Sequence, residues 1–162
     1  MANSAKEPVI RKKVVDVNIL SVFLVEDHPG HRYVREALMP GLKGSFLPVI
    51  LDTLPFRSYW ILTKKWHISR VESYEAIMSF LNLYEHPLYI GLEKKSILTA
   101  FKLSKELNHD VYDCYYIAAA LQENADTVLT TDTDFNTLCA KKSLKYENPI
   151  PPSVLKEFGQ RR

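Results

Sequence analysis

Short apolar runs alternate along the chain with longer segments in which apolar residues recur every three or four positions. The short runs predict buried strands and cover residues 14–18, 45–51, 87–90, 127–130 and 144–147. The longer segments predict helices over residues 31–42, 56–66, 71–83, 93–107, 111–124 and 135–140. Strands separated by helices favour an α/β layer fold with a mainly parallel central sheet.

The length of 162 residues fits one domain, which we expect over residues 11–150, with terminal extensions at 1–10 and 151–162. The 46% of apolar residues is typical of a globular protein and excludes wholesale disorder. No apolar run approaches the roughly 20 residues of a membrane-spanning helix, and residues 1–8 lack the apolar core of a signal peptide. We therefore expect a soluble, cytoplasmic protein.

Aspartates stand where predicted strands end and predicted helices begin. Asp16 and Asp132 follow two of the strands, Asp134 comes two residues later, and Asp52 and Asp113 lie at helix starts. Each of them alone can be explained as a turn residue or a helix cap. Because ligands bind beyond the carboxyl ends of parallel strands, we expect one fold to bring several of these acids to the same edge of the sheet.

Carboxylates held that close together need a counter-charge. Two of them repel by about 4 kcal/mol at roughly 4 Å and an effective dielectric of about 20. Oxygen ligands around an open site suit Mg²⁺ or Mn²⁺, which retain waters and also bind substrate phosphates. The pattern thus predicts metal-dependent phosphoryl chemistry.

Three stretches resemble the motifs of the PIN-domain nucleases. They are residues 14–18 (Val-Val-Asp-Val-Asn), residues 111–120 (Tyr-Asp before an alanine-rich helix) and residues 128–135 (ending Thr-Asp-Thr-Asp-Phe). Their order and separations also match, and the resemblance runs from about residue 13 to about residue 145. It implies a PIN-like fold, which is a three-layer sandwich with a mainly parallel sheet between helices.

The resemblance also implies a set of site residues. It makes metal-binding carboxylates of Asp16, Asp113 and Asp132, with Asp134 as an auxiliary acid at the metal site. It makes Asn18 and Thr130 polar residues that shape the site.

One position departs from the family pattern. The family usually has a glutamate at the start of its third helix, and the aligned residue here is Asp52. Aspartate is one methylene shorter, so Asp52 either joins the other catalytic acids, reaching the metal through water, or only caps a helix. Pro55 is also unusual there, and Arg57 lies near enough to offer a phosphate contact instead.

The activity that the resemblance implies is hydrolysis of RNA phosphodiesters with Mg²⁺ or Mn²⁺, leaving 5′-phosphate and 3′-hydroxyl ends. Single-domain relatives are most often toxins of toxin–antitoxin pairs, which predicts an antitoxin partner, and such proteins commonly form homodimers. Two alternatives are an rRNA-processing or decay nuclease and a non-catalytic PIN-like module that binds RNA or protein. A phosphatase of the haloacid-dehalogenase kind would need a second acid at position 18, where this chain has asparagine.

Charge and aromatic content add two expectations. The formal net charge is +2, and neutralising the four catalytic aspartates by metal raises the excess to about six positive charges, which suits an RNA partner. We expect Trp60 and Trp66 to be packing residues of a helix, and Tyr112, Tyr115 and Tyr116 to lie in the core or in an interface.

Overall fold

The computed structural model describes residues 8–158, so the ends of both expected extensions, residues 1–7 and 159–162, lie outside the described residues. The sheet has five strands in the order β3-β2-β1-β4-β5, and every neighbouring pair is parallel. The strands are β1 (Lys12–Val15), β2 (Leu47–Leu51), β3 (Leu88–Ile90), β4 (Thr127–Leu129) and β5 (Lys145–Glu147).

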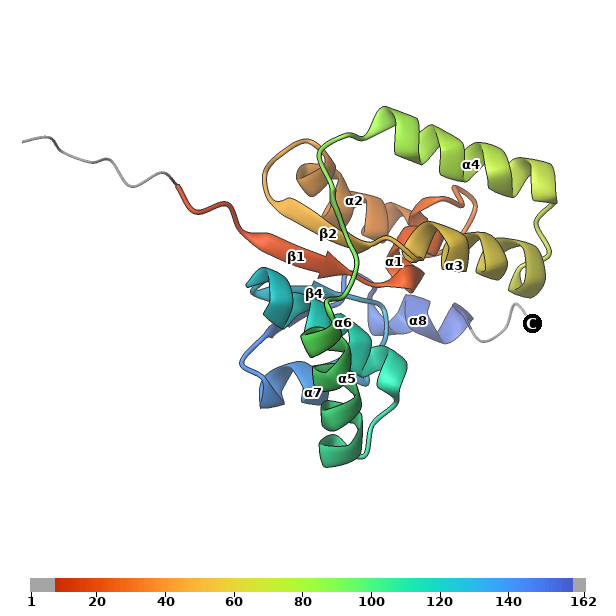
Figure 1. Cartoon of the computed structure of the whole chain (residues 1–162). Helices are drawn as coiled ribbons and strands as arrows, with labels where there is room; N and C mark the ends of the chain where they lie inside the picture. The colour runs from red at the N-terminus through yellow and green to blue at the C-terminus, as the bar shows by residue number, and fades with distance from the viewer. Residues whose placement is uncertain (1–7, 159–162) are drawn as a thin grey trace, which may run out of the picture.

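Helices cover both faces of this sheet (Figure 1). They are α1 (Val17–Phe23), α2 (His31–Leu42), α3 (Leu54–Trp60), α4 (Arg70–Leu83), α5 (Lys94–Leu107), α6 (Val111–Glu123), α7 (Phe135–Lys141) and α8 (Pro152–Phe158). A π-helical turn, η1 (Ile61–Lys65), continues α3. Helix α2 packs on β2, while α6 packs on β1 and β4 from the opposite side and carries α5 on its outer face. The predicted three-layer α/β fold is confirmed.

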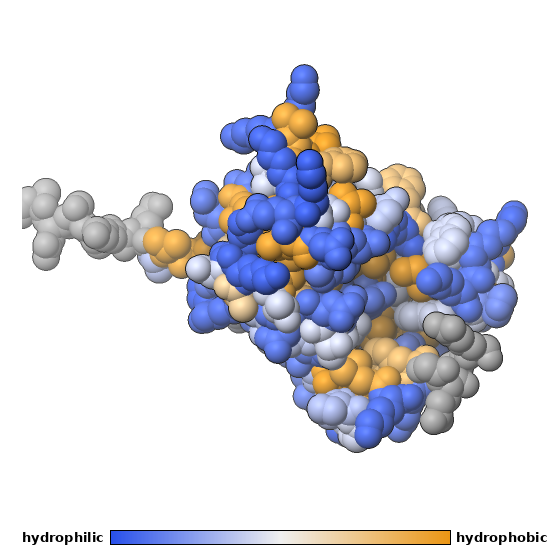
Figure 2. All heavy atoms as spheres, turned by 90° about the horizontal axis from the view of Figure 1, so that it is seen from below, coloured by the Kyte–Doolittle hydropathy of each residue, from blue (hydrophilic) through white to orange (hydrophobic). Residues whose placement is uncertain are grey.

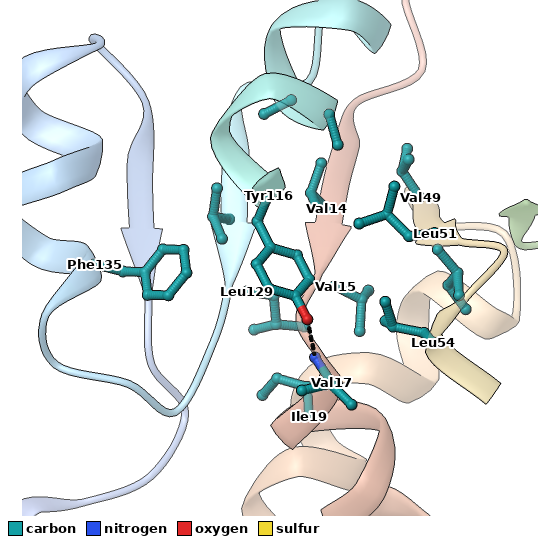
Figure 3. Packing of buried hydrophobic residues seen from close by; sticks show 14 of the residues in the cluster. Val14, Val15, Val17, Ile19, Val49, Leu51, Leu54, Tyr116, Leu129 and Phe135 are labelled. Carbon is teal, nitrogen blue, oxygen red and sulfur yellow. Dashed lines mark hydrogen bonds between the residues drawn. The ribbon is translucent and has the colours of Figure 1, made fainter. Parts of the chain in front are cut away.

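The core forms around β1 because this strand lies in the middle of the sheet. Val14 is in register with Val49 of β2 and with Val128 of β4, and all three are fully buried. Strands covered on both faces are apolar along their whole length, which explains why the sequence shows continuous apolar runs there. Figure 3 shows this core, into which α6 sends Tyr116 and α7 sends Phe135.

The order of the strands determines where a ligand can bind. The chain builds outward from β1 to β2 and β3, then returns to the other side of β1 with β4 and β5. The direction of winding therefore reverses between β1 and β4, and loops on the two sides diverge there. In such sheets the crevice beyond the carboxyl ends of those two strands is the usual ligand site.

One expectation about the aromatic residues is wrong, since Trp60, expected to be a packing residue, is 53% exposed. Tyr112 is 60% exposed and so lies outside the core, and an interface role for it stays a prediction. Trp66 is half-buried, with its ring 4.9 Å from that of His28, and Tyr116 is buried as expected.

The expected C-terminal extension contains α8, which packs against the turn between α1 and α2. The Phe158 ring meets the His28 ring edge-on at 4.7 Å between centroids. A Cβ atom at Gly30 would come within 2.7 Å of that phenyl ring, so a glycine is needed for the approach.

The surface of the described residues is mixed in character. On the face shown in Figure 2, hydrophilic residues predominate and hydrophobic residues show in small groups between them. Within residues 8–158, no helix is long and apolar enough to cross a membrane.

Candidate active site

A pocket of about 530 Å³ opens beyond the carboxyl ends of β1 and β4. Its walls come from α1, α3, η1, α6 and the loop after β4. The lining residues are Asp16, Val17, Asn18, Arg57, Trp60, Ile61, Lys65, Tyr112, Asp113, Tyr116, Asp132 and Phe135. The fold thus brings Asp16, Asp113 and Asp132 to one cavity, from positions spread over most of the chain.

Asp16 is the most deeply buried of these acids, with 2% of its surface exposed. It follows β1 directly and caps α1, because one carboxylate oxygen accepts the Ile19 N–H at 2.9 Å. The other oxygen accepts a hydrogen bond from the Thr130 hydroxyl. Burial raises the pKa of Asp16 to about 6, and the nearby charge of Asp132 adds to the rise, although both hydrogen bonds oppose it.

The loop after β4 is held by a chain of hydrogen bonds. The Thr130 hydroxyl that donates to Asp16 also accepts the Asp132 N–H at 3.0 Å. Asp132 in turn accepts the Asp134 N–H at 2.9 Å, which tightens the turn into α7. Thr130 therefore links Asp16 to Asp132, whereas Asp134 is exposed and does not line the pocket.

Asp113 reaches the pocket from the first turn of α6, a helix that Asp110 caps. Burial raises its pKa to about 6, the charge of Asp132 raises it further, and His109 opposes the rise. The His109 Nδ1 lies 3.2 Å from the Asp113 carboxylate. Sequence reasoning did not select His109; the signal for it was the spacing of four residues across the start of a helix.

Tyr116 and Arg57 line the same pocket as the acids. The Tyr116 hydroxyl accepts the Val17 N–H at 3.2 Å (Figure 3) and an Arg57 guanidinium N–H at 3.1 Å. The same guanidinium lies 4.9 Å from the centre of the Tyr112 ring. Burial raises the pKa of the Tyr116 hydroxyl, so it remains neutral and keeps both donors. Arg57 is thus fixed with its positive charge facing the pocket.

Asp52 lies apart from the other three acids. It is exposed and follows β2, where its N–H donates to the Ile90 carbonyl at 2.8 Å. Its carboxylate faces Gly91, whose position leaves room for it. Arg57 and Trp60 of α3 line the pocket, whereas Asp52, which precedes this helix, does not. A metal role for Asp52 stays a prediction.

The donor set of the pocket suits a hard divalent ion. Across the described part of the chain, no three or more His, Cys, Asp or Glu residues are grouped closely enough to enclose a metal by themselves. Mg²⁺ does not need such a cage, because it usually keeps several waters and binds through one or two carboxylates and substrate phosphates. Burial is the main reason that the pKa values of Asp16 and Asp113 are raised, and a cation would offset the negative charge of Asp132 that adds to the rise. The residues present therefore fit Mg²⁺ or Mn²⁺.

The all-parallel sheet and the acidic pocket beyond β1 and β4 agree with the family to which the chain is assigned. The chain belongs to the PIN domain family, whose model matches residues 13–141. No curated protein matches the chain.

Two solved structures show the same fold. The chain is similar to a chain of VapBC2 from Rickettsia felis, solved bound to a DNA fragment from its promoter, with 18% identity and a TM-score of 0.64 over 85% of this chain and 98% of that one. It is also similar to VapC20 from Mycobacterium tuberculosis, a toxin described as cleaving the sarcin-ricin loop. There the identity is 10% and the TM-score 0.63, over 78% of this chain and 94% of that one.

Proposed function

We propose that this protein is a Mg²⁺- or Mn²⁺-dependent endoribonuclease. The observation that carries the proposal is the convergence of Asp16, Asp113 and Asp132 on one pocket beside a fixed arginine. Membership of the PIN domain family supports it, since the sequence motifs that resemble the PIN nucleases supply these three acids.

Each side chain has a distinct part in this chemistry. Asp16, Asp113 and Asp132 would hold the ion, which when bound supplies an activated water and neutralises the non-bridging phosphate oxygens. Thr130 orients the Asp16 carboxylate through its hydrogen bond and ties it to the loop of Asp132. Arg57 is held by Tyr116 and would offer a guanidinium to the phosphate from the wall of the same pocket.

Substitution of Asp113 by asparagine tests the proposal. Asparagine keeps the size of the side chain but removes the charge that a divalent ion needs. We expect Asp113→Asn to lower Mn²⁺-dependent cleavage of a labelled RNA by at least about 10²-fold, the scale on which removal of a transition-state charge stabiliser acts. The fold should persist, as judged by circular dichroism.

The exposed Asp27 provides a matched control, because Asp27→Asn removes the same charge outside this pocket and should leave cleavage unchanged. Cleavage that survives Asp113→Asn, or that resists EDTA, contradicts the nuclease proposal. RNA binding without any cleavage in Mg²⁺ or Mn²⁺ would favour the non-catalytic module, an alternative that the displacement of Asp52 from the pocket keeps open.

We infer further that the nuclease acts in the cytoplasm as the toxin of a toxin–antitoxin pair. One structural neighbour belongs to a VapBC complex and the other is described as a toxin that cleaves the sarcin-ricin loop, which supports the inference. Expression of the chain alone should arrest growth, and co-expression of a neighbouring reading frame that encodes a small DNA-binding protein should relieve the arrest. Growth arrest that also follows expression of Asp113→Asn would contradict this role, and processing of a single rRNA precursor without arrest would favour a housekeeping nuclease.

We also infer a homodimer. An apolar groove of about 640 Å³ lies between α3, α5 and α6, and two of its lining residues, Phe56 and Phe101, are 77% and 62% exposed. Exposed apolar surface of this kind is typical of an interaction site. Sedimentation equilibrium should give twice the chain mass, and a monomer at all concentrations would contradict the inference.

A further inference from the structure

Trp60 stands at the rim of the acidic pocket. It is the last residue of α3, its side chain lines the cavity that contains Asp16, Asp113 and Asp132, and it is 53% exposed. A tryptophan whose function is packing would be covered by its neighbours. Its ring instead faces the space that a substrate must enter to reach the acids.

The π-helical turn explains how Lys65 joins Trp60 at this rim. The Trp66 N–H donates to the Ile61 carbonyl at 3.0 Å, which is the bonding pattern of a π-helix. In a continuous α-helix, positions 60 and 65 would point in directions roughly 140° apart. The wider π turn brings them nearly above one another, and the Lys65 Nζ lies 5.7 Å from the centre of the Trp60 ring. Such turns are frequent at functional sites.

The pocket therefore combines two chemically different sets of side chains. The acids line it, and so do the exposed ring of Trp60 and the cations Arg57 and Lys65. Arg57 is engaged with the Tyr116 hydroxyl, whereas Lys65 is exposed and has its Nζ 5.7 Å from the centre of the Trp60 ring. An aromatic ring beside a cation is an arrangement that binds a base and its adjoining phosphate in single-stranded nucleic acid.

We propose that Trp60 stacks on one unpaired base beside the scissile phosphate of RNA and that Lys65 binds the phosphate attached to it. The proposal rests on the nuclease function proposed above. Since Trp60 and the acids line the same cavity, one RNA strand can contact both. Bases in a duplex are covered on both faces by their neighbours, so this subsite selects unpaired RNA. Trp60 is thus a specificity-determining residue.

Binding of a short fluorescein-labelled single-stranded RNA, measured by anisotropy in EDTA to prevent cleavage, tests the subsite. Trp60→Ala should weaken binding about tenfold, the loss of one stacked base, whereas Trp60→Phe should retain most of the affinity. Tyr74→Ala, which removes a similarly exposed aromatic residue from α4, should have no effect. The same RNA annealed to its complement should bind wild type and Trp60→Ala equally.

The lysine is tested through the salt dependence of binding. Lys65→Ala should reduce the magnitude of the slope of log affinity against log salt by about one, which corresponds to the loss of one phosphate contact. Lys64→Ala, which changes the preceding residue outside the pocket lining, should leave the slope unchanged. Unchanged affinity for single-stranded RNA in Trp60→Ala overturns the subsite.

Further measurements separate this proposal from the one on which it rests. If wild type binds single-stranded RNA through Trp60 but cuts no RNA in Mn²⁺, the nuclease function fails and the base contact stands. If wild type cuts RNA and Trp60→Ala binds and cuts equally well, only the subsite fails. A Trp60→Ala variant that changes the sedimentation coefficient but not RNA affinity would assign the ring to a protein interface, and a wild type that binds no RNA overturns both proposals.

Discussion

The buried carboxylate of Asp16 should make the metal-free protein less stable as the pH rises. Burial raises its pKa from 3.8 to about 6 in the folded protein. Each pKa unit corresponds to about 1.36 kcal/mol, so ionising this group in the fold costs about 3 kcal/mol more than in the unfolded chain. Asparagine at this position carries no charge, and it caps a helix about as well as aspartate.

The sign follows from the direction of the shift. The folded protein holds the Asp16 proton more tightly than the unfolded chain, because the folded pKa is the higher of the two. Its contribution to stability is therefore complete below about pH 4 and is lost as the pH rises through about 6. As the pH rises through this range, wild type loses about 3 kcal/mol of its free energy of unfolding relative to Asp16→Asn, which has no charge to bury at position 16.

The measurement is urea unfolding of both proteins in EDTA near pH 4 and near pH 7.5. Hydrogen bonds that asparagine makes differently to Thr130 change both values alike, so they cancel when the two pH values are compared. Asp27→Asn, in an exposed turn, should show no such change. A difference between Asp16→Asn and wild type that is the same at both pH values would refute the reasoning. Mg²⁺ at about 100 times its dissociation constant should stabilise wild type by about 2.7 kcal/mol, and Asp16→Asn by less.

Three further changes test the packing of α2, the cap of α4 and the hydrogen bonds of the pocket. Gly41→Ala would place a Cβ within 2.4 Å of the buried Phe46 ring, so it should lower the free energy of urea unfolding by about 1–3 kcal/mol. Ser69→Ala removes the capping box of α4 and should cost about 1 kcal/mol in the same measurement, with no change in RNA cleavage. Tyr116→Phe leaves two hydrogen-bond donors without their acceptor. It should cost about 1–3 kcal/mol in stability and also weaken RNA cleavage, whereas cleavage at the wild-type rate would show that the arginine it holds has no part in the reaction.

Much of the site could be predicted from three stretches of sequence. Asp16 and Asp132 each follow an apolar run, and the rule that ligands bind beyond parallel strands places both at one edge before any coordinates are known. Asp113 was selected by its place in the first turn of an alanine-rich helix, and the structure brings it to the same pocket. The roles of these acids remain proposals, but their convergence is a property of the fold.

Asp52, Arg57 and Trp60 show where this reasoning ends. All three belong to the segment that leaves β2, and their spacing alone allows any one of them to face the acids. The direction in which α3 leaves the sheet decides that Arg57 and Trp60 line the pocket and that Asp52 does not. The π turn after Trp60 adds Lys65, and no hydrophobic periodicity indicates such a turn.

The amino-acid sequence by itself determined the alternation of strands and helices, the parallel sheet and the three acids beyond its inner strands. Those features depend on burial of apolar residues and on chain connectivity, which act locally or through general topological rules. Only the tertiary structure decided which side chains of α3 and η1 complete the pocket. A helix is placed by all the elements packed against it, and a rotation of one residue about its axis, about 100°, exchanges a side chain inside the pocket for one in solvent.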